Sequence, residues 1–458
     1  MEGIQAMFFS FCLLGVFLLL GKALRVAVRP FQALFLPASI LGGFIALLCG
    51  PYLLDLLPAW VTVNWTPLPG LLINLVFACL FLGVALPGAR ALWSRGGAQL
   101  CFGMVIGLGQ YAWALLVTVL LLTPFFGVPA VFASILEIGF SGGHGTAAGM
   151  SEVFQQVGFP AGSALSQMSA TVGIITAVLG GILVINIVVR RGYRTLANAG
   201  KPLRSHSGLL EKAEGFSIAR ATVAPESIEP LAFHFALVAL AVLLGWAMLG
   251  PVRGLHPLLR GFPLFPLAMI GGLVIQLLAA PLRLARYFDR DTFERILGFS
   301  LEMLVVAAIA TIRLDLFVAH LWPFVILMAV GIAWLFFAML FLAPRMFPQF
   351  RLERGITEFG MQSGVTAMGL LLLRLVDPLY DTGTAEAFGF KQMVYEPILG
   401  GGLLTAAAPF LIIELGSWWA LAICLGGMAL FWFISLLNGW FRFSPWPGGG
   451  PDPDKPEL

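Results

Sequence analysis

The sequence has few charged residues, and none of its cysteines falls in a recognisable pattern. Of 458 residues only 11% are charged and 59% are hydrophobic, whereas soluble domains carry about 25% charged residues. This scarcity excludes an ordinary soluble domain and predicts an all-α polytopic membrane protein. The five cysteines are odd in number and lie in or beside apolar runs, so no disulfide framework or metal spacing is indicated. We expect no organic cofactor and no nucleic-acid partner.

The N-terminal apolar run lacks the features of a cleaved signal peptide. No basic residue precedes it, no small-residue cleavage site follows it, and its first positive charges, Lys22, Arg25 and Arg29, come after it. We predict a retained first span with the N-terminus outside.

Apolar runs of spanning length recur along the chain, and two are interrupted by glycine and polar residues. Only one long segment, 190–229, is too polar to span. The predicted organisation is a first repeat at 1–195 with an interrupted tip at 137–150, a cytoplasmic central loop at 196–229, a second repeat at 230–415 with a tip at 358–369, an extra C-terminal span at 416–440 and a disordered tail at 441–458. Uninterrupted spans are predicted at 4–21, 33–54, 68–89, 99–123, 162–189, 231–250, 262–281, 296–314, 320–343, 393–413 and 417–437.

The first tip reads EIGFSGGHGTAAGM and contains five glycines. Glycine frees the backbone to leave the helix and to approach a ligand closely. At membrane depth, unwound backbone is tolerated only inside protein or beside a cavity. The stretch therefore predicts a re-entrant hairpin or a broken helix. The alternative is that the glycines only permit close helix packing.

Two local matches indicate that the halves are internal repeats. Pro37 to Phe44 has the pattern of Pro266 to Leu273, and Glu137 to Gly149 has the pattern of Glu358 to Gly369. Both matches occur in the same order along the chain.

The basic residues fix the predicted topology. If every span crosses, most of them fall on one side, which the positive-inside rule makes cytoplasmic. An odd number of crossings in the first half then inverts the second half. Broken helices at matching positions of inverted repeats point to a transporter's binding site near the midplane.

The segment SGGHGTAAG at 141–149 resembles the first re-entrant motif of the bacterial sodium/glutamate symporters of the GltS type. The layout of two inverted five-helix repeats, each with a glycine-rich hairpin, also resembles theirs. The second motif, Gly360 to Gly369, lacks the histidine, cysteine and proline pattern of the glutamate carriers, and an extra span follows at 417–437. The resemblance implies a bacterial inner-membrane protein that binds sodium and substrate at the hairpins and works as a homodimer.

The candidate site residues lie at the two tips. Unwound carbonyls and hydroxyls suit sodium, and free helix N-termini suit a carboxylate substrate. The candidate substrate ligands are Ser141, Gly142, Gly143, His144, Gly145, Thr146, Gln362, Ser363, Gly364 and Thr366. The sodium candidates are Ser141, Thr146, Ser363 and Thr366, with Glu137 and Glu358 as further candidates.

Three of these residues have two interpretations each. His144 either donates to a substrate carboxylate or holds the hairpin's shape. Glu137 and Glu358 either hold a cation or a proton inside the membrane, or they are solvated charges at helix ends.

Together these features predict a secondary active transporter, not an enzyme, that couples a small carboxylate such as glutamate to sodium entry by alternating access. A proton-coupled or non-glutamate organic-anion carrier of the same fold is the alternative. A membrane-embedded hydrolase using Ser141, His144 and Glu137 lacks an orienting acid. A channel would not need matched inverted tips.

Overall fold

The computed structural model describes residues 3–33, 36–85, 87–190, 219–312, 314–377 and 380–444. Every regular element in these ranges is a helix, and no strand occurs among them. Among the described residues, eight helices are long and apolar enough to cross a membrane. The predicted central loop lies outside the described residues up to 218, and the predicted tail lies outside them from 445 onward.

Helices occur at every predicted span, with boundaries that proline, glycine and charge explain. The predicted span 33–54 contains only α3 (Ala38–Cys49), which begins after Pro37 and ends at Gly50. The predicted span 99–123 is the central part of a longer helix. Its first turns carry Arg90 and Arg95, and a span predicted from hydropathy begins after these charged residues.

Contacts divide the chain into two compact units, and each contains segments from both predicted halves. Unit 1 comprises Met1–Leu86, His144–Gln167 and Arg204–Val318, and unit 2 comprises Pro87–Gly143, Met168–Leu203 and Ala319–Leu458. The first interrupted segment therefore divides after Gly143.

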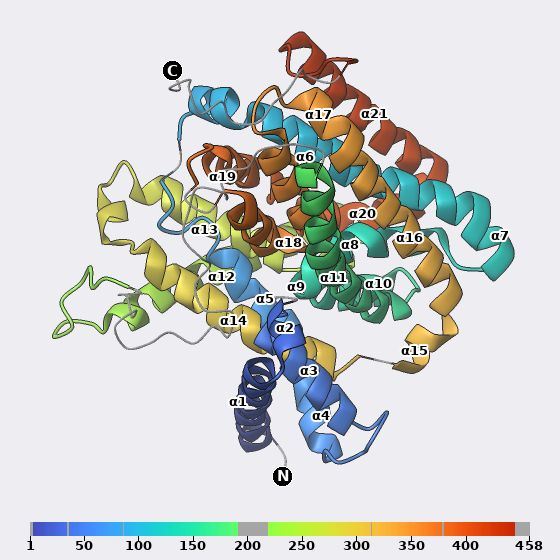
Figure 1. Cartoon of the computed structure of the whole chain (residues 1–458). Coiled ribbons are helices and arrows are strands. Elements are labelled where there is room, and N and C mark those ends of the chain that lie inside the picture. Colours follow the sequence, from blue (N-terminus) through green and yellow to red (C-terminus); the bar gives the residue numbers. More distant parts are fainter. Residues whose placement is uncertain are drawn as a thin grey trace. The chain divides into compact units, whose positions relative to one another are not determined.

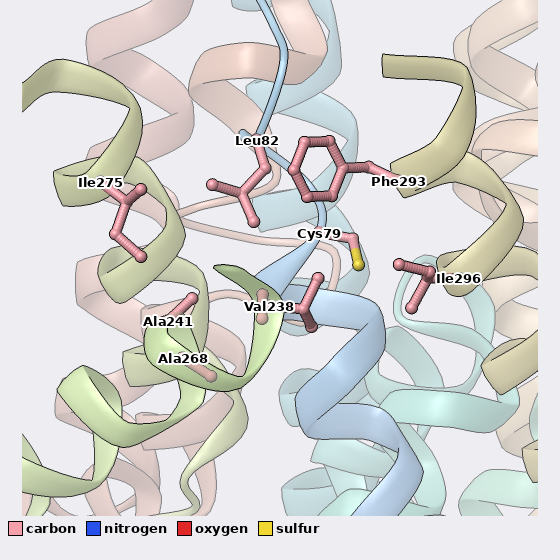
Figure 2. Packing of buried hydrophobic residues seen from close by; sticks show 9 residues of the cluster. Cys79, Leu82, Val238, Ala241, Ala268, Ile275, Phe293 and Ile296 are labelled. Atoms are coloured by element: carbon pink, nitrogen blue, oxygen red, sulfur yellow. The ribbon is translucent and has the colours of Figure 1, made fainter. Parts of the chain in front are cut away.

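Unit 1 packs around small, aliphatic and aromatic side chains. Figure 2 shows part of this core, where Cys79, Val238, Ala268 and Phe293 come from four different segments. Its elements are α1 (Ile4–Ala27), α2 (Arg29–Ala33), α3, α4 (Ala59–Trp65), α5 (Leu68–Ala78), α10 (Ser151–Gln156), α12 (Pro230–Leu255), η5 (Pro257–Gly261), α13 (Phe265–Ala279), η6 (Leu284–Tyr287) and α14 (Arg290–Ala310), with most of α9 (Gly143–Gly149) and α15 (Leu314–Ala319).

Glycine sets the closest helix contacts of unit 1. A Cβ on Gly42 of α3 would clash with the backbone of α1, and one on Gly271 of α13 would clash with the backbone of α12. The next residue in each helix is also a glycine, and it faces a helix from the opposite half. Gly43 lies against Ile309 of α14, and Gly272 lies against the backbone of α5. In each pair, therefore, the first glycine contacts a helix of its own predicted half and the second contacts a helix of the other half.

Unit 2 is built around a long helix, α6 (Ala89–Val117), which contacts α16, α18, α19 and α21. Figure 1 shows α21, drawn in red, which packs against α6. Its elements are α6, η1 (Thr118–Leu122), α7 (Thr123–Phe126), η2 (Ala130–Ser134), α8 (Ile135–Phe140), most of α11 (Ala161–Arg190), α16 (Leu321–Phe337), η7 (Ala338–Leu342), α17 (Ala343–Met346), α18 (Arg351–Val376), α19 (Thr384–Tyr395), α20 (Leu403–Leu415) and α21 (Ser417–Leu437).

The extra span and the first residues of the predicted tail belong to unit 2. Helix α21 packs on α6 and α20. Beyond it, the Phe441 amide donates to Ser435 O at 3.2 Å and the Arg442 amide donates to Arg345 O at 3.0 Å. Residues 441–444 are therefore held against the preceding helices by backbone hydrogen bonds.

Candidate functional site

The first interrupted segment leaves the helix at Ser141 and Gly142. Helix α8 ends at Phe140, and the amides of Ser141 and Gly142 both donate to Glu137 O at 3.1 Å. Gly143 then adopts φ +71°, a left-handed conformation that favours glycine. A Cβ on Gly143 would also clash with Val365 Cγ1. Conformation and space both require glycine here.

The second interrupted segment lies inside α18. Gly364 and Val365 have non-helical backbone angles, with Val365 at φ 72°. A β-branched residue in the left-handed region is rare and strained. Beyond the break the chain turns back, because a Cβ on Gly360 would lie 2.9 Å from Gly369 Cα, although nine residues of unbroken helix would extend roughly 13 Å.

The two breaks approach each other within unit 2. Gly143 of the first faces Val365 of the second. The Tyr395 hydroxyl links the same segments, since it lies 3.2 Å from Ser141 Oγ and donates to Gln362 Oε1 at 3.1 Å. Candidate residues from the two sequence motifs therefore share one polar cluster.

Glu137 is fully buried, and its hydrogen-bond donors within the described part of unit 2 are uncharged. Its Oε2 accepts from the Tyr111 hydroxyl at 2.6 Å, and its Oε1 accepts from the Gly400 amide at 2.9 Å and Thr405 Oγ1 at 3.2 Å. Complete burial excludes the alternative of a solvated charge at a helix end.

Glu358 is also fully buried, but its partner is a cation. Its Oε1 lies 2.7 Å from Lys391 Nζ, and both side chains are 0% exposed. Gln99 and Gln362 each donate to this carboxylate at 3.0 Å. Here too, the solvated alternative is excluded.

Gln362 connects the ion pair to the break. Its amide donates to Gly103 O at 3.0 Å as well as to Glu358, while Gln110 donates to its backbone oxygen at 2.7 Å and to its side-chain oxygen at 3.2 Å. Every polar atom of the Gln362 side chain thus has a partner. Such a network rigidifies the half-helix just before the break.

Two glycines of α6 provide the space for this network. A Cβ on Gly103 would lie 2.5 Å from Lys391 Cε and 2.7 Å from Glu358 Oε1, and one on Gly107 would clash with the Tyr395 hydroxyl. Gly103 and Gly107 are four residues apart and so lie on one helix face.

The hydroxyl candidates at the second break are already engaged. Ser363 Oγ donates to Phe359 O at 2.6 Å. Thr366 Oγ1 donates to Glu396 Oε1 at 2.7 Å and accepts from Gln392 Nε2 at 2.6 Å. Glu396 is thereby added to the groups around the break.

The remaining candidates, His144, Gly145 and Thr146, belong to unit 1. All three are buried, and Thr146 Oγ1 has no hydrogen-bond partner within the described residues. A Cβ on Gly145 would lie 2.6 Å from Ile73 Cδ1. Close packing alone therefore accounts for Gly145, whereas the Thr146 oxygen is available as a ligand.

Unit 1 also contains a pocket of about 370 Å³ beside this segment. Residues just after the first tip contribute to its wall, and these are mostly small or polar, so a hydrated solute could occupy it. The lining includes Ala148, Ser151, Gln155, Ser163 and Gln167, together with Thr62, Thr66 and Thr311.

Sequence reasoning missed the residues that complete the cluster of unit 2. Lys391 and Tyr395 lie on α19, and Gln99, Gln110 and Tyr111 lie on α6. A signal was present in α6, where Gln99, Gly103, Gly107 and Gln110 recur at helical spacing. Lys391 lies just before the predicted span 393–413, with Glu386 and Glu396 five residues away on either side, and no motif distinguished it.

Comparison with known proteins gives one family. The model of the sodium/glutamate symporter family matches residues 5–352. The match includes the first interrupted segment and ends before the break in α18. No curated protein matches the chain.

Proposed function

Because the chain belongs to the sodium/glutamate symporter family, we propose that it is a secondary active transporter that couples sodium entry to uptake of glutamate or a related small carboxylate. Family membership carries this proposal. The membrane helices and the buried polar cluster at two interrupted helices are consistent with it.

The proposed substrate site lies at the two interrupted segments. In general, helix termini can bind a carboxylate through their N–H groups, and unwound backbone can bind sodium through its oxygens. The proposed ligands are the ten tip residues predicted from the sequence, with Thr146 as the foremost sodium ligand because its buried hydroxyl oxygen has no partner among the described residues.

Inverted repeats are part of the proposal, and two correspondences support them. Helices α6 and α16 are each followed directly by a π segment, at Thr118–Leu122 and Ala338–Leu342, and then by a short helix with proline in its first turn. π segments are rare in proteins as a whole, and those that do occur are often at functional sites. The second correspondence is the placement of the glycine pairs in unit 1, where the first glycine contacts its own predicted half and the second contacts the other half.

We further propose alternating access in a homodimer in the inner membrane, with the central loop cytoplasmic. The exposed large apolar side chains, such as Trp246, Trp322 and Trp419, provide surface for lipid and for a second copy.

Uptake of labelled glutamate into proteoliposomes tests the proposal. An inward sodium gradient should drive accumulation, and replacing sodium with choline at fixed pH should abolish it. Accumulation driven equally by a proton gradient would favour the proton-coupled alternative. A shift in thermal stability with another acid, but none with glutamate, would change the substrate and keep the mechanism. Sodium conductance without substrate would instead indicate a channel.

A further inference from the structure

The Lys391 ammonium occupies a buried cage of the kind that a small cation requires. Its Nζ lies 2.7 Å from Glu358 Oε1, 2.7 Å from Gln392 Oε1 and 3.4 Å from Met361 Sδ. The ring of Tyr395 covers it, with the ring centroid 3.6 Å away. A carboxylate, an amide oxygen and an aromatic face all stabilise positive charge.

The cage is built into the packing of unit 2. Gly103 leaves room for the Lys391 stem and the Glu358 carboxylate, since a Cβ there would touch both. Gln99 and Gln362 fix the carboxylate by donating to its two oxygens. If the ammonium were removed, these groups would remain as a preformed anionic cavity.

The ammonium also joins the two sides of the break in α18. On one side it binds Glu358, which precedes the break. On the other it donates to Gln392, whose amide donates to Thr366, the first residue after the break. A positive charge at this point therefore stabilises the relative position of the two half-helices.

We propose that Lys391 is a tethered cation that fills a built cation site, so that free sodium enters this site only when the lysine side chain is shortened. The inference deepens the proposed function, because it removes this site from those that sodium occupies during symport. Glu358 is then a fixed counter-charge and not a sodium ligand in the unaltered chain.

A simple structural ion pair is the competing explanation. Buried pairs can often be replaced by apolar side chains with no loss of stability. Such a pair would give no sodium dependence when only the lysine is removed. The two explanations therefore differ in the sodium response of a lysine variant.

The test is the thermal stability of the purified full chain carrying Lys391→Ala, measured without substrate in sodium or choline chloride at constant ionic strength. Raising sodium from about 1 to about 100 mM should raise the melting temperature of the variant by at least about 2 °C more than that of the unaltered protein. Glu358→Gln combined with Lys391→Ala should lose this extra shift, because the carboxylate ligand is gone.

A second lysine variant and three contrary results complete the test of the cation site. Lys391→Ser also shortens the side chain and leaves the cage open, so it should show the same sodium shift if the alanine variant does not fold. An identical sodium response in variant and unaltered protein would overturn the proposal, and so would a shift that persists in the double variant. Failure of both single variants to fold at high sodium would overturn it as well, since bound sodium should restore the missing charge.

These measurements are independent of transport. If the unaltered protein accumulates no glutamate, the proposed function fails while the sodium shift of the lysine variants still reports on the cage.

Discussion

The two interrupted segments carry the same sequence pattern but differ in what surrounds their matching residues. Glu137 accepts from a tyrosine, a threonine and a backbone amide, whereas Glu358 is paired with Lys391. The atoms nearest to a Cβ on Gly149 all belong to side chains, whereas the atom nearest to a Cβ on Gly369 is a backbone oxygen. The Thr146 hydroxyl has no partner within the described residues, whereas the Thr366 hydroxyl has two. The same sequence pattern therefore lies in two different chemical environments.

The largest expected difference concerns the two glutamates. Glu358→Gln leaves the Lys391 charge buried without its counter-ion, so we expect a loss of about 3–5 kcal/mol in the free energy of unfolding. Glu137→Gln removes a charge whose partners are uncharged and should cost about 1–3 kcal/mol. Thermal or chemical denaturation of the purified variants measures both.

A second substitution, Lys391→Met, provides the control for the two glutamine variants. Adding Lys391→Met to Glu358→Gln should restore most of the lost stability, because the unpaired charge is removed. Adding Lys391→Met to Glu137→Gln should restore nothing. Equal losses for the two single glutamine variants would contradict the distinction between the two environments.

A smaller difference is expected for the matching glycines. A Cβ on Gly369 would lie 2.6 Å from Thr357 O, a backbone atom that cannot rotate away. We expect Gly369→Ala to cost about 1–3 kcal/mol through overpacking. At Gly149 the nearest atoms belong to the Phe265 ring at 3.1 Å, and a small rotation of the ring relieves the contact, so Gly149→Ala should cost less.

Gly389→Ala is the matched control for the glycine series. Gly389 lies on α19 near Lys391, and a Cβ there would meet no atom within 4 Å. Because alanine favours helix over glycine by about 1 kcal/mol, this variant should be at least as stable as the unaltered protein. A Gly369→Ala variant as stable as Gly389→Ala would show that the half-helices do not pack as closely as described.

The sequence was sufficient for the membrane class, the family and the location of both interruptions. Scarcity of charge, the SGGHGTAAG motif and the match between Glu137 and Glu358 are local features that survive without tertiary information. The partner of Glu358 was not predictable in this way, because Lys391 is 33 residues away and is brought to it by the turn at Gly364 and the packing of α19. Sequence symmetry likewise implied equal roles for two glutamates whose long-range contacts differ.

The smallest stability effect, and the most direct test of function, concerns the matching threonines. Thr366→Val removes one donor and one acceptor from the Gln392 and Glu396 network, and we expect a loss of about 1–2 kcal/mol. Thr146→Val removes a hydroxyl that makes no hydrogen bond within the described residues, so its stability should change by less than about 0.5 kcal/mol.

For sodium-coupled uptake the order of the two valine variants should be reversed, with the larger effect for Thr146→Val. If Thr146 supplies an oxygen to sodium, Thr146→Val should raise the sodium concentration for half-maximal uptake several-fold, because a hard cation loses one ligand that a methyl group cannot replace. Thr146→Ser retains the oxygen and should behave like the unaltered protein. If the valine variant keeps both its stability and its sodium dependence, Thr146 is not a ligand. The buried hydroxyl would then be a polar group left unsatisfied by close packing around Ile73 and Leu304, which lie against the neighbouring Gly145.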